Sequence, residues 1–373
     1  MPCLSKRTSD LHASPVREML SVAGRPGVIS FAGGLPAPET FAELKLSTPP
    51  PDLLQYGPSE GEPELRARIA EELRAIGIAT TPERILILTG SQQGIDLVAK
   101  LVVDAGASIS VETPTYLAAL QVFRFFGAQV TAMDRGDPAA GWSKAAPRLA
   151  YVTPTFQNPT GACWGAAERI ALARACDAHD TILLEDDPYR DLVYEPCERR
   201  PVCSWLERAS FIYQGSFSKT VAPGLRLGFL TASEDLFPFL VRLKQAADLH
   251  TNRLSQWMVL QYLNDPGRAG RLERVVSFYR ERRDLFAAAM ERHMSGIADW
   301  SVPPGGLFFW ATLRKGVDSQ ALLALALEQN VLFTPGCYFL ADGSASSSMR
   351  LNFSLVGPDA AEQGLKIIGE LAR

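Results

Sequence analysis

Short apolar runs alternate with helix-length segments through the middle of the chain, from Arg84 to Phe229. The apolar runs predict strands at Ile85–Leu88, Ser108–Val111, Gln129–Ala132, Leu149–Val152, Thr181–Leu184, Phe211–Tyr213 and Leu227–Leu230. The segments between them predict helices at Gln93–Val103, Tyr116–Phe126 and Ala166–His179. Strands that alternate with helices favour a mostly parallel sheet covered on both faces. We therefore predict an α/β fold, with a large domain built on a mostly parallel seven-stranded sheet flanked by helices.

The pattern changes after Phe229, where long helical stretches follow one another. These stretches are Asp235–Ala247, Arg253–Leu263 and Arg268–Met294. The last of them is rich in Arg and Glu, and we interpret it as a connector between domains. From Trp300 onward, predicted strands mix with predicted helices at Gly306–Leu313, Ser319–Gln329, Val331–Thr334, Met349–Phe353 and Asp359–Leu371. This mixture predicts a second, smaller α/β domain.

The same pattern divides the chain into three parts. Residues 1–40 are an N-terminal segment that we expect to pack with the small domain, residues 41–285 are the large domain, and residues 286–373 are the small C-terminal domain. Within the first part, the stretch from Ser30 to Phe41 is rich in Gly and Pro. This composition predicts a loop rather than a core element.

Composition narrows the class of protein. A hydrophobic content of 47% and a charged fraction of 21% are ordinary for a globular protein of 373 residues. The net charge of −4 gives no reason to expect nucleic acid or an anionic membrane as a partner. No apolar run approaches the ~20 residues that span a bilayer, and the N-terminus lacks the apolar core of a signal peptide, so we expect a cytoplasmic protein. Scattered cysteines and four histidines argue against a metal site or a disulfide framework.

The stretch from Gly215 to Phe229 carries the strongest sign of chemistry. Around a turn between two apolar runs it places Ser216, Ser218, Lys219 and Arg226. Hydroxyls and a second cation disfavour the ammonium form of a lysine, which leaves the amine nucleophilic enough to form a Schiff base near neutral pH. The same hydroxyls and the guanidinium offer donors to a phosphate. This combination suggests pyridoxal phosphate, although a solvated surface lysine is the plainer alternative.

Polar residues at two other strand ends point to the same edge of the predicted sheet, where ligands of parallel sheets bind. Ser91 lies between a strand and a helix, where it can help to hold a phosphate or simply cap the helix. Asp186 follows a buried run, and a buried carboxylate there can keep a pyridine nitrogen protonated. An acidic pair in a solvated loop is the alternative for Asp186.

Four further side chains have a functional interpretation, and three of them also have a plain one. Tyr116 can stack on a planar cofactor or belong to the core. Asn158, in FQNPTG, can hydrogen-bond a phenolic oxygen or serve a proline turn, and Tyr189 can donate to the same oxygen. Arg350 lies inside an apolar run and needs an anionic partner, which is either a substrate carboxylate or an internal salt bridge.

Five motifs together resemble a known family. SQQGIDL, FQNPTG, EDDPYRDL, GSFSKTVAPGLRLGF and MRLNFS occur in the order and at roughly the separations seen in fold-type I pyridoxal-phosphate aminotransferases. The resemblance runs from SPVREML to the C-terminus, and it is strongest to the subgroup of 2-aminoadipate, kynurenine and broad-specificity aminotransferases. It implies an enzyme that moves the amino group of an α-amino acid to a 2-oxo acid, such as 2-oxoglutarate, by a ping-pong mechanism.

The resemblance implies a role for each matching residue. Lys219 would be the Schiff-base lysine and the proton carrier, and Asp186 would pair with the pyridine nitrogen. Asn158 and Tyr189 would contact the ring hydroxyl, and Tyr116 would stack on the ring. The phosphate would be held by Ser91, Gln92, Ser216, Ser218 and Arg226. Tyr56, in LQYGPSEG, matches a tyrosine that reaches the phosphate of the neighbouring subunit, which implies a homodimer with shared active sites.

The resemblance also implies how the substrate is bound. Arg350, beside Asn158, would bind the α-carboxylate. In this subgroup a mobile N-terminal helix closes over the substrate, and Ser14 and Arg17 match its motif, while Gly34 in AGGLP lines the same cavity. Arg17 would suit the distal carboxylate of glutamate or 2-aminoadipate and could swing aside for aromatic or branched-chain donors. A surface helix with a solvated arginine is the alternative.

Two other functions remain open from the sequence. The same residues suit a decarboxylase, a lyase or a C–C bond-forming synthase, because the bond that breaks depends on how the substrate is held. A transcription regulator with an aminotransferase-like domain would need a DNA-binding domain of ~60 residues or more. The short stretch before SPVREML does not supply one, so we rank the regulator last.

Overall fold

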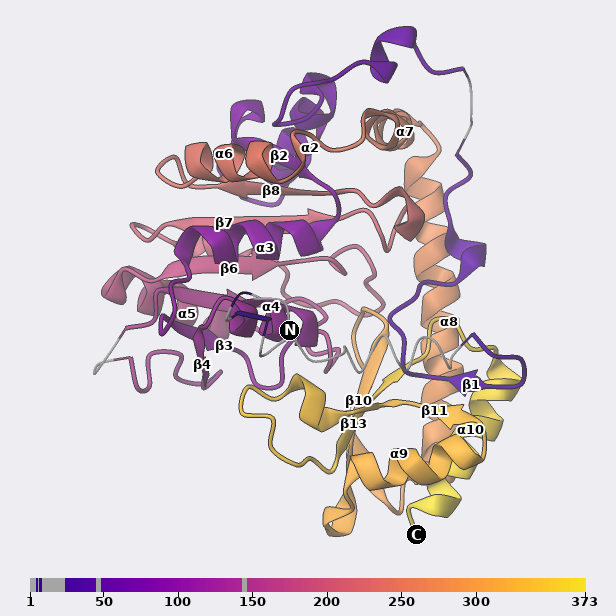
Figure 1. The fold of residues 1–373 in the computed structure, drawn as a ribbon. Coiled ribbons are helices and arrows are strands. Elements are labelled where there is room, and N and C mark those ends of the chain that lie inside the picture. Colours follow the sequence, from indigo (N-terminus) through magenta and orange to yellow (C-terminus); the bar gives the residue numbers. More distant parts are fainter. Residues whose placement is uncertain (1–4, 6, 9–23, 45–47, 143–145) are drawn as a thin grey trace.

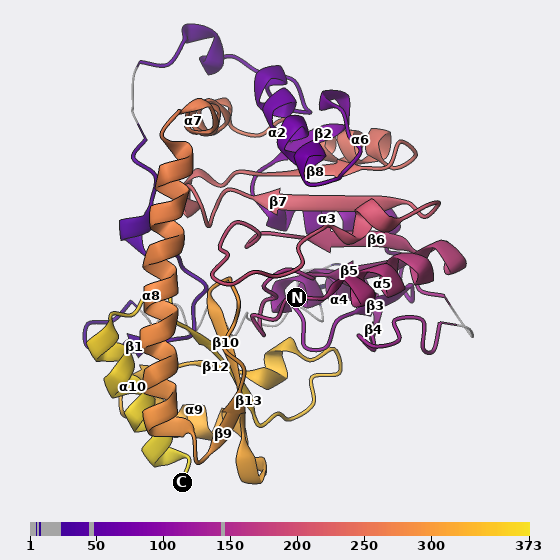
Figure 2. The ribbon, with the colours of Figure 1, turned by 180° about the vertical axis from the view of Figure 1, so that it is seen from behind.

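The chain forms a large α/β unit and a smaller one, and a long helix runs along both (Figure 1). The computed structural model describes residues 5, 7–8, 24–44, 48–142 and 146–373. The long helix is α8 (Arg268–Met294), which Figure 2 shows from behind. The predicted division at residue 285 falls inside α8, so that boundary stays a prediction. Within the described residues, no helix is both long enough and apolar enough to span a membrane.

The large unit is built on a seven-stranded sheet in the order β2-β8-β7-β6-β5-β3-β4. Its strands are β2 (Ile85–Leu88), β3 (Ser108–Val111), β4 (Gln129–Ala132), β5 (Leu149–Val152), β6 (Ile182–Asp186), β7 (Phe211–Ser216) and β8 (Gly228–Ala232). Strand β8 is antiparallel to both of its neighbours, and the remaining pairs are parallel. The predicted fold class is confirmed.

Two strands are longer than the apolar pattern predicts. Strand β6 continues to Asp186 and β7 to Ser216, and Asp186 pairs with Gln214 across the ladder. We expected both polar residues to follow their strands. The prediction ended each strand at its last apolar residue, but backbone hydrogen bonding does not depend on the polarity of the side chain. The carboxylate and the hydroxyl are therefore fixed on the sheet itself.

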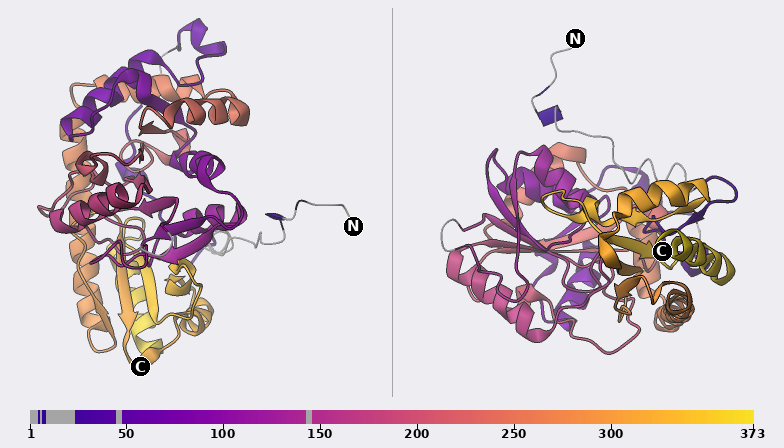
Figure 3. Two further views of the ribbon diagram at one scale, coloured as in Figure 1. Left: turned by 90° about the vertical axis from the view of Figure 1, so that its left-hand side faces the viewer. Right: turned by 90° about the horizontal axis from the view of Figure 1, so that it is seen from below.

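Helices cover both faces of this sheet, as the view from below in Figure 3 shows. One face packs against α2 (Pro63–Ala75), α5 (Ala166–His179) and α7 (Arg253–Asn264). The other face packs against α3 (Ser91–Val102), α4 (Leu117–Phe125) and α6 (Phe237–Asp248). On α3 the buried residues Ile95, Val98 and Val102 recur at helical spacing.

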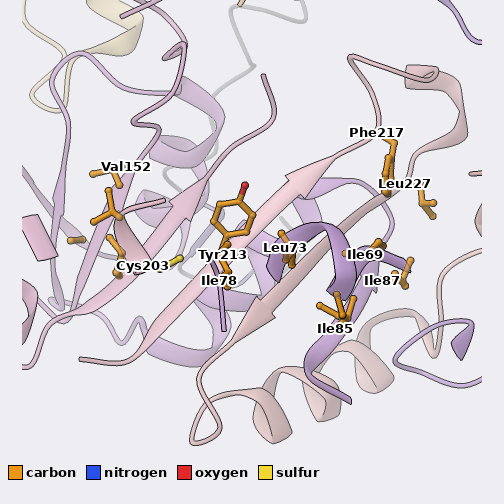
Figure 4. Close-up of a cluster of buried hydrophobic side chains, with 14 of the residues drawn as sticks. Ile69, Leu73, Ile78, Ile85, Ile87, Val152, Cys203, Tyr213, Phe217 and Leu227 are labelled. Carbon is orange, nitrogen blue, oxygen red and sulfur yellow. The ribbon is translucent and has the colours of Figure 1, made fainter. Parts of the chain in front are cut away.

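Alternation along β2 explains how one apolar strand serves two cores. Figure 4 shows Ile85 and Ile87 on the side of Ile69 and Leu73, which lie one turn apart on α2. Leu86 and Leu88 belong to the core on the opposite face. Successive side chains of a strand point to opposite faces, so a run that is apolar throughout indicates a strand covered on both sides.

The small unit holds a four-stranded antiparallel sheet in the order β12-β13-β10-β9. These strands are β9 (Ala298–Trp300), β10 (Phe308–Leu313), β12 (Thr334–Pro335) and β13 (Ser348–Asn352). Helices α9 (Ser319–Glu328) and α10 (Pro358–Leu371) accompany the sheet, and α10 packs along α8. Short 3-10 turns lie at Pro38–Thr40, Pro51–Leu54, Pro82–Arg84, Val202–Trp205, Pro223–Leu225, Arg314–Gly316 and Gly336–Phe339.

The N-terminal segment joins the small unit. Strand β1 (Ile29–Ser30) pairs in parallel with β11 (Val331–Leu332). Phe31 is 0% exposed and packs edge-on against Phe286 of α8, with ring centroids 5.4 Å apart. Most of the stretch from Ser30 to Phe41 is loop, as predicted, but the prediction that it lies outside the core is wrong. Gly and Pro set the backbone of this segment, but the apolar residues between them are free to be buried.

Candidate active site

A pocket lies at the carboxyl ends of the central strands. It is lined by Ser91, Gln92, Tyr116, Thr153, Asn158, Asp186, Pro188, Tyr189, Ser216, Ser218, Lys219 and Arg226. All the residues predicted to contact the cofactor lie in this lining, with the exception of Tyr56. The lining comes from segments that are far apart in the sequence, so the fold brings the predicted motifs together.

Lys219 lies in the turn after β7. Its Nζ donates to the carbonyl of Gly34 at 2.8 Å and lies 5.8 Å from the centroid of the Tyr189 ring. Burial, followed by the charges of Arg350 and Arg226, lowers the pKa of Lys219 to about 8. The sequence suggested hydroxyls and one cation as the cause. Burial is the larger cause, and Arg350 adds a second cation from the small unit.

Asp186 lines the pocket, and one of its carboxylate oxygens has no hydrogen-bond partner among the described residues. Its Oδ2 accepts a hydrogen bond from the Tyr151 hydroxyl at 3.0 Å, while its buried Oδ1 has no hydrogen-bond partner among the described residues. Burial raises the pKa of Asp186 to about 6, although Gln214 and Tyr151 act in the opposite direction. A buried carboxylate oxygen without a donor is costly. A ligand with an N–H group, such as a protonated pyridine ring, would supply that donor.

Among the described residues, the groups that hold the buried cation of Arg350 are all neutral. Arg350 is 3% exposed, and its Nη1 donates to Oδ1 of Asn158 at 2.8 Å. Its Nη2 donates to the Ala32 carbonyl and to Oγ1 of Thr334, and its Nε has no hydrogen-bond partner in the described part of the chain. Burial lowers the pKa of Arg350 to about 10.

The internal salt bridge that the sequence left open for Arg350 is not found among the described residues. The groups that shift its pKa besides burial are two tyrosines, and no carboxylate is among them. Its guanidinium lies over Phe308 and Phe339, 4.5 Å and 4.9 Å from the ring centroids. A buried cation on aromatic faces, with a spare donor, suits an incoming carboxylate.

The start of α3 and Arg226 lie together at one corner of the pocket. Gly90 precedes the helix with a φ of 78°, and a Cβ at this position would lie 2.5 Å from Nη2 of Arg226. Glycine therefore leaves room for the guanidinium against the turn. Across the pocket, Oγ of Ser216 accepts from the Ser218 N–H at 3.2 Å. A helix N-terminus beside a guanidinium and hydroxyls is a suitable phosphate site.

Two tyrosines complete the lining near Asn158. The Tyr116 hydroxyl donates to Oε1 of Gln92 at 3.2 Å. The Tyr189 ring packs edge-on against Phe308, with centroids 5.6 Å apart. Burial raises the pKa of both tyrosines above the ordinary value, so each keeps its proton and remains a donor at neutral pH.

The remaining predicted residues lie in different places. The Gly34 carbonyl accepts from Lys219, and a Cβ on Gly34 would lie 3.1 Å from the Phe308 ring. Tyr56 does not line the pocket of its own chain, and it is 77% exposed. Ser14 and Arg17 lie outside the described residues.

Three residues near the pocket were missed from the sequence. Tyr151 holds Asp186, the Thr153 hydroxyl is buried without a partner among the described residues, and Gln214 lies beside Asp186 on β7. Tyr151 stands in the run LAYV, where it resembles an ordinary core residue. Strand alternation could have told which face it points to, but its partner on the next strand depends on register.

The residues fit pyridoxal phosphate. Asp186 offers an acceptor for a ring N–H, Lys219 offers an amine whose pKa is lowered to about 8, and Arg226 with the start of α3 offers donors for a phosphate.

Comparisons with known proteins agree with this geometry. Residues 28–368 match the family described as aminotransferase class I and II. The chain is 36% identical to the 2-aminoadipate transaminase of Thermus thermophilus, over 98% of this chain and 95% of that protein. It is 34% identical to aromatic-amino-acid aminotransferase 1 of Thermococcus litoralis, over 98% of this chain and 93% of the relative.

A solved structure extends the likeness to three dimensions. The crystal structure of an α-aminoadipate aminotransferase from Thermus thermophilus, complexed with N-(5'-phosphopyridoxyl)-L-leucine, superposes with a TM-score of 0.86. The two sequences are 33% identical, over 99% of this chain and 97% of that one. The chain belongs to the class I and II aminotransferases, and it is a pyridoxal-phosphate-dependent enzyme that transfers an amino group between an amino acid and a 2-oxo acid.

Proposed function

We propose that the pocket around Lys219 transaminates α-amino acids whose carboxylate is bound by Arg350. The observation that carries this proposal is the state of Arg350, which is buried, lacks a carboxylate partner among the described residues and keeps Nε free of hydrogen bonds to them. A buried cation of this kind is expensive unless an anion pairs with it. An α-amino acid brings that anion next to its amino group.

Each residue of the pocket has a task in this proposal. When bound, pyridoxal phosphate supplies an electron-withdrawing ring that makes the proton on the substrate's α carbon acidic. Nζ of Lys219, poised near neutrality, removes that proton and carries it. Asp186 accepts the ring N–H, while Asn158 and Tyr189 orient the ring hydroxyl.

The rest of the lining holds the cofactor in place. Tyr116 stacks on the ring, and the phosphate is bound by Ser91, Gln92, Ser216, Ser218 and Arg226. These assignments are supported by the shared pocket and by the cradle at Gly90. Because the phosphate contacts lie away from the reacting atoms, they keep the ring in place while bonds of the substrate are made and broken.

The amino donors form a separate part of the proposal. We infer that 2-aminoadipate, glutamate, aromatic and branched-chain amino acids are candidates, with 2-oxoglutarate as acceptor. The inference rests on the names of the similar proteins and on the sequence motif at Ser14 and Arg17. If Arg17 binds a distal carboxylate, Arg17→Gln should lower kcat/KM for glutamate and 2-aminoadipate. The same substitution should leave kcat/KM for leucine and phenylalanine unchanged.

A half-reaction experiment tests the function directly. The holoenzyme is mixed with one amino acid at a time, without an oxo acid, and its absorbance spectrum is followed. We expect conversion of the aldehyde form of the cofactor to the pyridoxamine form, with release of the matching 2-oxo acid. Lys219→Ala should bind the cofactor without this conversion. Release of carbon dioxide instead would support a decarboxylase, and no conversion by any amino acid would exclude transamination.

We also infer a homodimer with shared active sites, working in the cytoplasm. Leu54 and Tyr56 are 72% and 77% exposed, and Arg253 holds their segment by donating to the carbonyls of Asp52 and Gln55. A fixed, exposed apolar segment suits a subunit contact. The described cysteines are free thiols, which agrees with a reducing compartment.

Subunit mixing tests the shared site. Lys219→Ala chains are mixed with Tyr56→Ala chains under conditions that allow exchange, at limiting cofactor. If Tyr56 serves the neighbouring subunit, each mixed dimer has one intact site, and statistical mixing should restore about a quarter of the parent activity. No recovery in a sample shown by light scattering to contain mixed dimers would place Tyr56 in its own subunit's function.

A further inference from the structure

A buried lysine lies behind the start of α3, outside the pocket lining. The side chain of Lys244, on α6, is 0% exposed. Its Nζ donates to Oε1 of Gln93 at 2.7 Å, to Oδ2 of Asp248 at 2.8 Å and to Oγ1 of Thr251 at 2.8 Å. An ammonium has three donors, so all of them are used. We call Thr89, Gln93, Lys244, Asp248 and Thr251 the Lys244 cluster.

The Lys244 cluster holds the turn Thr89–Gly90–Ser91, here called the α3 turn. Oε1 of Gln93, which accepts from Lys244, also accepts from the Thr89 N–H at 2.9 Å. On the other side, Nε2 of Gln93 and Oγ1 of Thr89 donate to Oδ2 of Asp248 at 2.8 Å and 3.0 Å. The backbone and the side chain of Thr89 are therefore both tied to the cluster.

The cluster also fixes the strand that enters the turn. Oγ1 of Thr251, which accepts from Lys244, donates to the carbonyl of Ile87 on β2 at 3.0 Å. The guanidinium of Arg226, which lines the pocket, also lies against Gly90 of the α3 turn. The turn is thus held both by Arg226 in the pocket lining and by the Lys244 cluster outside it.

The charge on Lys244 has a specific use in this arrangement. Burial lowers the pKa of Lys244, while its ion pair with Asp248 acts in the opposite direction. A leucine would fill the same space without that cost. What leucine lacks is a donor for Gln93, and that donor orients the amide oxygen toward both Lys244 and the Thr89 N–H. Reversing the amide would leave two donors facing its NH₂ group.

We propose that Lys244 is a positioning residue for the cofactor's phosphate. It fixes the amide of Gln93, and through that amide it keeps the α3 turn in the form that presents Ser91 and Gln92 to the phosphate. This inference rests on the proposed assignment of the phosphate to the α3 turn. Lys244 does not line the pocket, so its effect passes through Gln93 and Thr89.

The test compares two aldehydes that differ only in the phosphate. Apo-protein is prepared with hydroxylamine, and its affinities for pyridoxal phosphate and pyridoxal are measured by absorbance titration. Both aldehydes can react with Lys219, so the ratio of their affinities isolates the phosphate. In Lys244→Met we expect affinity for pyridoxal phosphate to fall about tenfold or more, because hydrogen bonds that hold the turn are lost. Affinity for pyridoxal should stay unchanged.

Lys100→Met is the matched control. Lys100 forms an i,i+4 pair with Asp96 at 2.6 Å on α3 itself, but it lies toward the other end of the helix. The same change of residue type on the same helix should leave both affinities as in the parent protein.

The outcomes separate the inference from the assignment on which it rests. If the parent binds both aldehydes equally, the proposed phosphate site is wrong. If the parent prefers pyridoxal phosphate and Lys244→Met keeps the same preference, the role of Lys244 is wrong. Should Lys244→Met fail to fold, Gln93→Leu leaves Lys244 with Asp248 and Thr251. It removes the amide of Gln93 and with it the bond to the Thr89 N–H and the bond to Asp248, while the Thr89 hydroxyl still donates to Asp248. This variant should show the same selective loss, and an unchanged ratio in Gln93→Leu overturns the inference.

Discussion

The Tyr151 hydroxyl donates a hydrogen bond to Oδ2 of Asp186, over 3.0 Å, from the strand next to it in the sheet. The adjacent carboxylate is held in the same way on the other face, where the Tyr213 hydroxyl donates to Oδ2 of Asp187 at 2.9 Å. Tyr151 belongs to the core beside α3, and Tyr213 to the core beside α2. Strand alternation therefore sends two neighbouring acids to opposite sides, and Asp186 lines the pocket around Lys219.

This pairing predicts how Tyr151→Phe changes cofactor binding with pH. Tyr151 lowers the pKa of Asp186 against the effect of burial, so the substitution should raise that pKa above about 6. The carboxylate is needed to accept a ring N–H. As the pH is lowered, the affinity of the apo-protein for pyridoxal phosphate should therefore fall at a higher pH than in the parent. The midpoint should shift upward by about half to one pH unit for one lost hydrogen bond.

Tyr213→Phe provides the comparison, because it removes the same hydroxyl from Asp187. We expect its pH curve for cofactor affinity to follow the parent curve. Equal shifts in both variants would mean that the effect comes from general loosening of the sheet.

Lys219 should make the stability of the apo-protein depend on pH. Its pKa is lowered to about 8 in the folded protein from an ordinary 10.5, so between these values the unfolded chain binds more protons and stability rises with pH. At pH 7 the penalty for the buried ammonium is fully present. Apo Lys219→Met should then be more stable than the parent by about 1 kcal/mol, a figure that allows for partial exposure of the amine.

Urea unfolding of the two apo-proteins at pH 7 and pH 10 measures this difference. The gap should narrow at pH 10, because the parent has lost most of its penalty there while the variant has none. A gap that is the same at both pH values would show that Lys219 is not the titrating group.

Most strands of the large sheet were predictable because burial on both faces makes their runs apolar. Strand β4, at the edge of the sheet, is the exception, since it is largely exposed. The direction of β8 was not predicted, since it depends on the link from β7. That link, from Phe217 to Leu227, contains only the turn Pro223–Leu225, whereas a parallel crossover needs a dozen or more residues. Applying that length rule would have predicted the antiparallel pair.

The site also holds residues that the sequence could indicate and residues that it could not. Lys219, Asp186 and Asn158 stand in local motifs whose residue types point to their chemistry, so the sequence could indicate them. Tyr151 and Lys244 act through partners more than 30 and 140 residues away in the chain, on Asp186 and Gln93 respectively. Nothing in the runs around them indicates these partners, because only the register of the sheet and the packing of α6 on α3 bring them together.

Replacing Arg350 should impair reaction with amino acids, which carry an α-carboxylate, more than reaction with the corresponding amines, which do not. In Arg350→Lys we expect the KM of an amino acid to rise about 30- to 150-fold, because a bidentate charged contact worth about 2–3 kcal/mol is lost. The half-reaction rate of the corresponding amine without a carboxylate should change little. Affinity for the cofactor serves as a control and should stay close to that of the parent. Equal losses for the acid and the amine would contradict a role in carboxylate binding.

Arg169 closes the loop that carries Asn158. This fully buried arginine donates to the carbonyl of Pro154 at 2.8 Å and to that of Trp164 at 3.1 Å, so it ties the two ends of the loop together. It also lies 3.9 Å from Glu185, whose pKa burial raises to about 7. Arg169→Met would leave buried carbonyls without a donor and Glu185 without its cation. We expect a loss of about 3–5 kcal/mol in the free energy of unfolding.

The loss in Arg169→Met should itself depend on pH. Arg169 lowers the pKa of Glu185, so its removal raises that pKa further, and the folded variant binds a proton at Glu185 to a higher pH than the parent does. Stability of the variant should therefore keep falling as pH rises above 7, where the contribution of Glu185 in the parent has levelled off.

Urea unfolding at pH 6 and pH 8 measures both proteins. In Arg200→Met, which removes an arginine that stacks on Trp205 at 3.7 Å, we expect little change at either pH. A loss in Arg169→Met that is equal at the two pH values would mean that Arg169 does not change the pKa of Glu185, and that Arg169 acts through the loop carbonyls alone.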